Sequence, residues 1–205
     1  MAVYRHRPLT IAALEKMVDA SAEERSSEIG EVGSDCRIVG ARFIREVRIG
    51  NGVEIDGASI LENATLCDGA RVGVDVKAYD LIAAEGSVID NGSIVERCFV
   101  GESCRLDKGF TAAESLFFAN SHCENGEAAS IFAGPYTVSH HKSSLLIAGM
   151  FSFFNAGSGS NQSNHLFKSG AVHQSVHLRG CKFASSAYIM SPALEGAFTM
   201  VMGHH

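Results

Sequence analysis

The sequence has 205 residues, of which 46% are hydrophobic and 20% are charged. This length is enough for one domain with a sizeable core and does not require two. The formal net charge of −6 and the pI near 5.8 provide no diffuse positive field, so nucleic acids and anionic membrane surfaces are not expected partners.

The sequence also lacks the signals of a membrane or secreted protein. It contains no run of about 18 apolar residues, and its first ten residues, MAVYRHRPLT, lack the apolar region of a signal peptide. The 6 cysteines are dispersed and form no C-x-x-C pair, which argues against a disulfide framework and a zinc knuckle. We therefore expect reduced cysteines and a cytoplasmic location.

The first element expected along the chain is a short amphipathic helix. Thr10 is a suitable N-cap, and Ile11, Leu14 and Val18 share one helical face, with the helix ending near residues 19–20. Residues 21–28 are then expected to form a connector. This gives an N-terminal segment at 1–28 and a main domain at 29–205.

A six-residue periodicity begins after this segment and predicts the fold. A six-residue unit matches neither an α-helix nor an alternating strand, so we interpret it as a short strand followed by a corner. Three such units would form one triangular coil, and the stacked coils would form a left-handed parallel β-helix of hexapeptide repeats. The aliphatic residues at this spacing are Ile49, Ile55 and Leu61, followed by Ile82, Val88, Ile94, Val100 and Leu106.

Two regions depart from this frame. Nine residues at 73–81 occupy the space of six, which predicts a corner insertion near residues 76–79. The pattern weakens between about 112 and 172, where the coils are expected to continue with irregularities. It resumes with small residues spaced by six, namely Ser175, Cys181, Ala187, Ala193 and Thr199.

Three segments in this second half carry a resemblance to a known family. They are SIFAGPYTVSHHK at 130–142, GMFSFFNAG at 149–157 and SNQSNH at 160–165. On these segments the chain resembles a bacterial hexapeptide-repeat family of unknown function, domain-of-unknown-function family 4954. The resemblance extends over essentially the whole chain.

The resemblance implies several properties. Members of the family are longer proteins, so the chain is expected to be part of a longer parent, and His204 and His205 are either native or tag residues. The fold is related to left-handed β-helix acyltransferases and to the C-terminal domains of sugar-phosphate nucleotidyltransferases. Proteins of this fold class are usually trimers with sites between subunits, so a homotrimer is expected.

The histidines of the second half suggest a site for a small-molecule ligand. In acyl transfer, a near-neutral imidazole removes a proton from an attacking hydroxyl or amine. We predict His140 or His141 as this general base, with a coenzyme A thioester or a nucleotide sugar as the candidate co-substrate. The predicted substrate-binding residues are Lys142, Asn161, Asn164, His165 and His173.

Two alternatives remain open from the sequence. One is a zinc enzyme of the carbonic-anhydrase type, whose three imidazoles would come from His122, His140 and His177. His122 and His140 are separated by three six-residue units, one expected coil, which would stack them on neighbouring strands. The other is a non-catalytic scaffold that trimerises and positions a separate catalytic region of the parent protein.

Overall fold

The computed structural model describes residue 4, residues 6–163 and residues 175–205, and it divides the chain into two units, 1–30 and 31–205. The first unit contains the helix α1 (Pro8–Arg25), which has Pro8 in its first turn. The helix is longer than predicted, since residues 21–24 continue it and do not form a connector. No helix in the described part of the chain is both long and apolar enough to cross a membrane.

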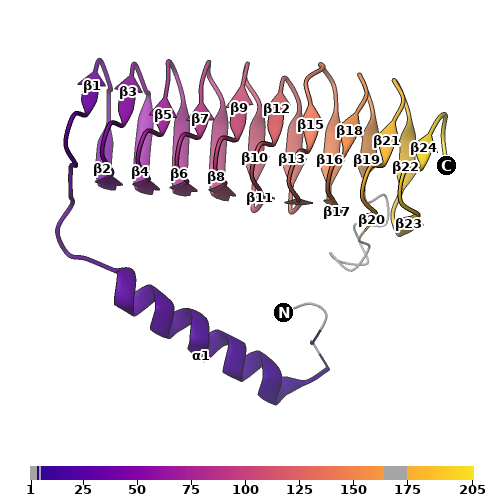
Figure 1. The fold of residues 1–205 in the computed structure, drawn as a ribbon, viewed down its shortest axis with the longest axis horizontal. Helices are drawn as coiled ribbons and strands as arrows, with labels where there is room; N and C mark the ends of the chain where they lie inside the picture. The colour runs from indigo at the N-terminus through magenta and orange to yellow at the C-terminus, as the bar shows by residue number, and fades with distance from the viewer. Residues whose placement is uncertain (1–3, 5, 164–174) are drawn as a thin grey trace. The chain divides into compact units, whose positions relative to one another are not determined.

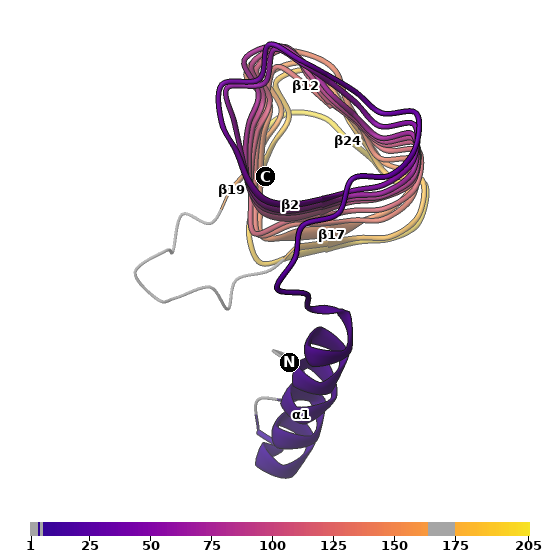
Figure 2. The same cartoon turned by 90° about the vertical axis from the view of Figure 1, so that its left-hand side faces the viewer.

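The second unit is a parallel β-solenoid, and the predicted left-handed parallel β-helix with a short N-terminal helix is confirmed (Figure 1). Its coils have a triangular outline when viewed along the solenoid axis (Figure 2). We number the three sides as faces 1, 2 and 3 in chain order. Corner A joins faces 1 and 2, corner B joins faces 2 and 3, and corner C returns the chain to face 1.

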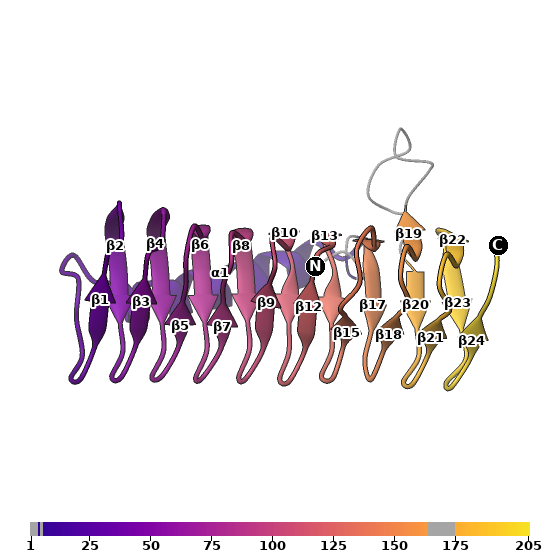
Figure 3. The same ribbon diagram turned by 90° about the horizontal axis from the view of Figure 1, so that it is seen from above.

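Face 1 is a ten-stranded parallel sheet whose strands follow one another along the solenoid (Figure 3). Its strands are β1 (Arg37–Val39), β3 (Glu54–Asp56), β5 (Arg71–Val72), β7 (Val88–Ile89), β9 (Arg105–Asp107), β12 (His122–Glu124), β15 (Val138–Ser139), β18 (Asn155–Ala156), β21 (Lys182–Phe183) and β24 (Met200–Val201).

Faces 2 and 3 belong to one fourteen-stranded sheet. In the first coils a single strand continues around corner B, as in β2 (Ile44–Ile49), β4 (Ile60–Leu66), β6 (Lys77–Ala83) and β8 (Ile94–Val100). Later coils divide into face 2 strands β10 (Thr111–Ala113), β13 (Glu127–Ala129), β16 (Leu145–Ile147), β19 (Asn161–Ser163) and β22 (Tyr188–Met190). The matching face 3 strands are β11 (Leu116–Phe117), β14 (Phe132–Ala133), β17 (Gly149–Phe151), β20 (Ser175–His177) and β23 (Ala193–Glu195).

The coil in the first half is one residue shorter than the three six-residue units expected. Register pairs Glu54 with Arg71 and Arg71 with Val88, a separation of 17 in sequence that the Asn63–Asp80 contact repeats. The missing residue is at corner B, where the inward residues Leu61 and Ala64 are three apart, whereas the inward residues Ile49 and Val53 that flank corner C are four apart. The six-residue unit therefore holds on two sides and is one residue shorter on the third.

The shorter coil explains where the six-residue frame failed. The frame slips by one residue in each coil, so Ile82 and Ile94 point outward and are exposed, in contrast to the prediction. No insertion exists at residues 76–79, because Val76 is fully buried and β6 runs directly from Lys77. The predicted late resumption of coils is present in β20 to β24.

The core is a set of inward columns in which each residue lies on its counterpart one coil earlier. Neighbouring parallel strands are about 4.8 Å apart, so such columns exclude water without large side chains. Corners need backbone conformations with positive φ, which Gly52 at corner C and Asn63 at corner B supply with φ of 63° and 48°. The inward column of face 1 consists of Ile55, Val72, Ile89, Leu106, Cys123, Ser139, Ala156, Phe183 and Val201.

The inward column of face 3 ends in two polar residues. His177 pairs in register with Phe151 on one side and Glu195 on the other. His177 is 1% exposed, its ring packs against Phe154 and Phe183, and its Nδ1 lies next to Glu195 Oε2. Burial lowers the pKa of His177 to about 4, because the apolar surroundings penalise the imidazolium.

This lowered pKa predicts a stability that falls in acid. The unfolded chain takes up a proton near pH 6.5 and the folded chain only near pH 4, so the His177 contribution is complete above pH 6.5 and is lost as the pH falls toward 4. The loss amounts to about 3 kcal/mol. The free energy of unfolding, measured with denaturant at pH 7 and pH 4.5, should differ less in His177→Gln than in the wild type, because the glutamine side chain is polar but does not titrate. An equal pH dependence in both proteins would contradict this assignment.

Candidate functional site

Face 1 carries a continuous series of polar side chains on its outer surface. Arg37 Nη1 lies 2.9 Å from Asp56 Oδ2, and Arg71 Nε lies 3.0 Å from Glu54 Oε2. Each of these pairs joins neighbouring coils. Because all four side chains are between 45% and 62% exposed, each pair contributes little to stability.

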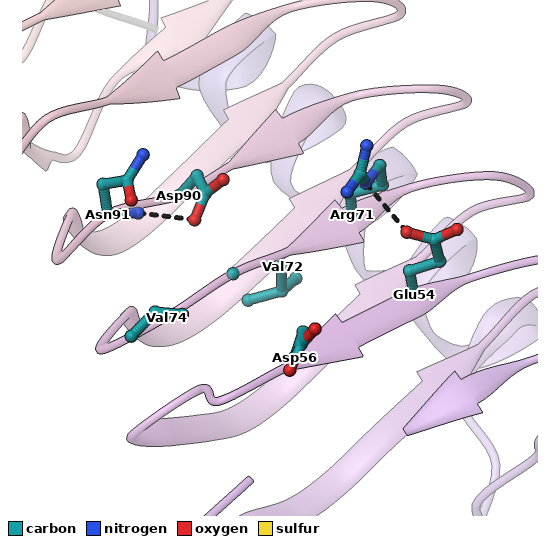
Figure 4. Close-up of a pocket in the computed structure, with 8 residues that line it drawn as sticks. Glu54, Asp56, Arg71, Val72, Val74, Asp90 and Asn91 are labelled. Carbon is teal, nitrogen blue, oxygen red and sulfur yellow. Dashed lines mark hydrogen bonds and ion pairs between the residues drawn. The ribbon is translucent and has the colours of Figure 1, made fainter. Parts of the chain in front are cut away.

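A small hollow of about 170 Å³ lies within this series, between β3, β5 and β7 (Figure 4). It depends on Gly73, since a Cβ there would lie 1.7 Å from the Asp90 carboxylate oxygen Oδ1. Its polar groups already have partners: Glu54 pairs with Arg71, and the Asn91 backbone N–H donates to Asp90 at 2.7 Å (Figure 4). The hollow is therefore small, and its polar side chains are already paired with neighbouring groups.

The next coils bury two carboxylates in this outer surface, and the first is Asp107. Its side chain is 3% exposed and accepts hydrogen bonds from Arg105 Nε at 2.9 Å and Asn91 Nδ2 at 2.7 Å. Burial by itself would raise the pKa of Asp107, but the hydrogen bonds from Asn91 and Arg105 outweigh it and hold the pKa below its usual value. Asp107 is thus a fixed negative charge.

Glu124 is the second buried carboxylate and the centre of the site. It accepts a hydrogen bond from Lys108 Nζ at 2.6 Å, and its other oxygen lies 2.7 Å from His122 Nε2. Burial opposes its charge, yet the hydrogen bonds from Lys108 and His122 hold the pKa of Glu124 below its usual value. A carboxylate at Nε2 favours the tautomer with the proton on that nitrogen and fixes the ring orientation.

His140 completes the cluster, which we call the His–Glu cluster: Lys108, His122, Glu124 and His140. The ring centroids of His122 and His140 are 4.3 Å apart, so the two rings lie close together, although the residues are not aligned in register as predicted. The coil here is two residues shorter than expected, however, because Val138 is the register partner of His122. Burial first, and then the charge of His122, lowers the pKa of His140, which keeps its imidazole neutral at pH 7.

The other predicted site residues are dispersed. His141 and Lys142 are exposed and follow His140 in corner A. Asn161 begins β19 on face 2, is half-buried, and has a buried Oδ1 atom with no hydrogen-bond partner among the described residues. The predictions for three further residues lie outside the described residues; these are Asn164, His165 and His173.

The predicted zinc site with His122, His140 and His177 as ligands is wrong. His177 points into the solenoid interior on face 3, whereas His122 and His140 lie on the outer surface of face 1, so the three imidazoles cannot converge. In residue 4 and the ranges 6–163 and 175–205, no group of three or more His, Cys, Asp or Glu side chains is placed to hold a metal ion. His122 instead belongs with Glu124.

The sequence reasoning missed Lys108, Asp107 and Glu124. Their signal was a nearly constant spacing along the outer surface, since Asn91 contacts Asp107 at a separation of 16 in sequence, and Asp107 is the register partner of Glu124. A search with a period one residue shorter than three six-residue units would have placed Asp107 and Glu124 in one outward column. It would have aligned His141 with them in place of His140, because the coil after His122 is shorter by one further residue.

Fold and site together define a parallel β-solenoid with a histidine–carboxylate cluster on one outer face. The sequence matches the family described as Domain of unknown function (DUF4954) over residues 1–205, and the chain belongs to this family. No similar sequence is found among curated proteins.

The solved structures that are similar to the chain include the following two. One is a candidate acetyltransferase from Desulfovibrio desulfuricans G20, with 10% identity, a TM-score of 0.35, and coverage of 87% of this chain and 69% of that one. The other is a UDP-N-acetylglucosamine acyltransferase from Campylobacter jejuni, with 14% identity, a TM-score of 0.25 and the same two coverages.

Glu124 should contribute both to stability and to the order of the cluster. Glu124→Gln removes the charge that Lys108 and His122 share, at an expected cost of about 1–2 kcal/mol in the free energy of unfolding. The folded pKa of Glu124 is depressed, so this contribution is present above pH 4.5 and is lost as the pH falls through the folded pKa. Urea unfolding at pH 7 measures the cost, with the exposed Glu127→Gln as control. A cost smaller than about 0.5 kcal/mol, the lower end for a single hydrogen bond, would argue against a shared charge.

Proposed function

We propose that the protein is a cytoplasmic transferase that acts on an activated sugar or another phosphorylated small molecule, with His140 as general base. The observation that carries the proposal is the His–Glu cluster on an open outer face. A neutral His140 beside a carboxylate-held His122 is suited to accepting a proton.

The chemistry follows from these two residues. His140 takes the proton of an acceptor hydroxyl or amine as its oxygen or nitrogen attacks the carbonyl carbon of a coenzyme A thioester. The new C–O or C–N bond forms, the C–S bond breaks, and the thiolate that leaves takes the proton from His140. The Glu124 carboxylate, which also holds His122, favours the transient positive charge on the His140 ring.

Of the two residues that follow His140, His141 and Lys142, only Lys142 is proposed to assist substrate binding. Both are exposed and follow His140 directly, so they lie next to the cluster along the chain. A Lys ammonium is a suitable point charge for a phosphate group. In this scheme Lys142 binds the phosphate and His141 remains dispensable for the chemical step.

The test separates binding from turnover. A thermal-shift screen against coenzyme A thioesters and nucleotide sugars first identifies ligands, and acyl transfer between them is then measured. His140→Ala should lower kcat about 100- to 10,000-fold while leaving ligand binding intact, and the acid limb of the wild-type pH profile should lie below pH 6.5. His141→Ala is the matched control and should change kcat less than threefold. Unchanged kcat in His140→Ala would refute the assignment.

A second candidate function is a trimerising scaffold, and an apolar row on face 3 favours it. The row occupies one outward register position through seven consecutive coils and includes several exposed side chains. Contiguous exposed apolar surface of this kind marks interaction sites. The residues are Ile82, Phe99, Leu116, Phe132, Met150, Val176 and Leu194.

We propose that the protein forms a homotrimer through this row, whether it acts as a transferase or as a scaffold. Phe118 widens the surface, with its ring centroid 5.8 Å from that of Phe99 and 4.8 Å from that of Phe132. A three-fold arrangement closes without leaving an unpaired copy of the surface. If the wild-type protein trimerises but binds no member of the ligand screen, the scaffold is the better account.

Substituting one residue of the row tests the assembly. Met150→Glu places a charge in the proposed interface and should convert the trimer to a monomer in sedimentation velocity. Met200→Glu is the control, because Met200 is equally exposed, at 53% against 51%, but lies on face 1. A wild-type monomer at working concentration, or a trimer in both variants, would exclude this interface.

A further inference from the structure

Corner A changes length in two adjacent coils beside the His–Glu cluster. In the first of these coils, three residues separate Cys123 on face 1 from Glu127 on face 2. In the next coil, five residues separate their register partners Ser139 and Leu145. The coil before them has four residues between Leu106 and Thr111, and the coil after them has four between Ala156 and Asn161. A shortened corner is therefore followed directly by a lengthened one.

This step in the corner produces a hollow on face 2. The corner through Asn125 and Gly126 is retracted, and the following corner, residues 140–144, is longer. The hollow has a volume of about 480 Å³, within the range of small-molecule sites. We call it the corner A hollow; it is lined by Asn125, Gly126, Glu127, Ser143, Ser144, Leu145 and Asn161.

The close fit of the two corners fixes this shape. A Cβ on Gly126 would lie 2.8 Å from the backbone oxygen of Ser144, so a larger residue would push the corners apart. Ser144 is 2% exposed, and its hydroxyl donates to the backbone oxygen of Gly157 at 3.2 Å. The retracted corner is thus packed closely against the lengthened corner, and the lengthened corner is in turn hydrogen-bonded to the following coil.

The lining offers hydrogen bonds without positive charge. Asn125 uses Nδ2 to donate to the His140 backbone oxygen at 3.0 Å, which leaves its Oδ1 as an acceptor. Glu127 has an exposed carboxylate, and Ser143 an exposed hydroxyl position. Within residues 6–163 and 175–205, Asn161 Oδ1 has no partner, so these residues leave hydrogen-bonding capacity on this amide unused. Leu145 adds one half-buried apolar surface.

Such a lining suits a neutral, hydroxyl-rich ring. Carboxylate and amide oxygens accept hydrogen bonds from hydroxyl groups, and the apolar surface fits the C–H face of the ring. None of the seven described lining residues is aromatic, which disfavours a stacked base. These seven residues also include no Lys or Arg, so a phosphate is not favoured inside the hollow.

We infer that the corner A hollow binds the sugar ring of the substrate. The inference rests on the proposed function for the link between this ring and the His–Glu cluster. Asn125 provides that link, because it lines the hollow and is hydrogen-bonded to the backbone of His140. The phosphate of the same molecule then extends toward the five-residue corner that contains His141 and Lys142.

Calorimetric titration of the intact chain tests the inference. The probes are glucose 1-phosphate, N-acetylglucosamine 1-phosphate and their uridine diphosphate derivatives, with inorganic phosphate alone for comparison. Glu127→Trp fills the hollow from an outward strand position and should raise the Kd of the tightest sugar probe at least tenfold. Asn161→Ala, a smaller change, should raise it about fivefold.

Ile94→Trp is the matched control, because Ile94 occupies the same outward register position as Glu127 two coils earlier, beside a corner of ordinary length. It should leave the Kd within twofold of wild type. Inorganic phosphate binding as tightly as the sugar phosphates, binding by none of the sugar probes, or an equal Kd in Glu127→Trp and Ile94→Trp would each overturn the inference.

These results are separable from those for the proposed function. If Glu127→Trp abolishes sugar binding but the protein shows no group transfer, the hollow is supported as a sugar site and the transferase proposal is refuted. If group transfer depends on His140 but Glu127→Trp leaves the Kd of the sugar probe unchanged, the transferase proposal is supported and the hollow is refuted as the sugar site.

Discussion

The hydrogen bonding of each coil to the next is the constraint on which the rest of the structure depends. Parallel strands on all three faces pair in register, so every side chain has a fixed neighbour one coil earlier and one coil later. Inward columns then exclude water without large residues, and outward columns become series of like positions. The polar series on face 1 and the apolar row on face 3 both result from this repetition. The residues of the candidate site and of the apolar row are therefore arranged by column rather than by local motif.

The sequence predicted the architecture because aliphatic residues recur at nearly constant spacing. Ile49, Ile55 and Leu61 are all buried as expected, and the small residues from Ser175 onward do belong to further coils. The frame failed at Ile82 and Ile94, since corner B is one residue shorter than the other corners and shifts the phase by one in each coil. Such a shift is invisible to a search that assumes three equal units in each turn.

The candidate site was predictable in part. The proximity of His122 and His140 followed from their separation by about one coil, and the structure brings their rings together. The position of His177 did not follow, because the column of a residue depends on the summed lengths of all preceding corners. Glu124 was missed for the same reason: its partners Lys108 and His122 become neighbours only once the coil length is known.

The pairing of each coil only with its immediate neighbours also determines how damage spreads. Register partners lie one coil apart in the solenoid, so a distorted coil loses support from two others and from no distant part of the chain. Stability in such an array behaves as a sum of unit and neighbour terms, and folding can begin in any well-packed group of coils and extend outward. One end of the solenoid can therefore lose order while the other end keeps its native structure.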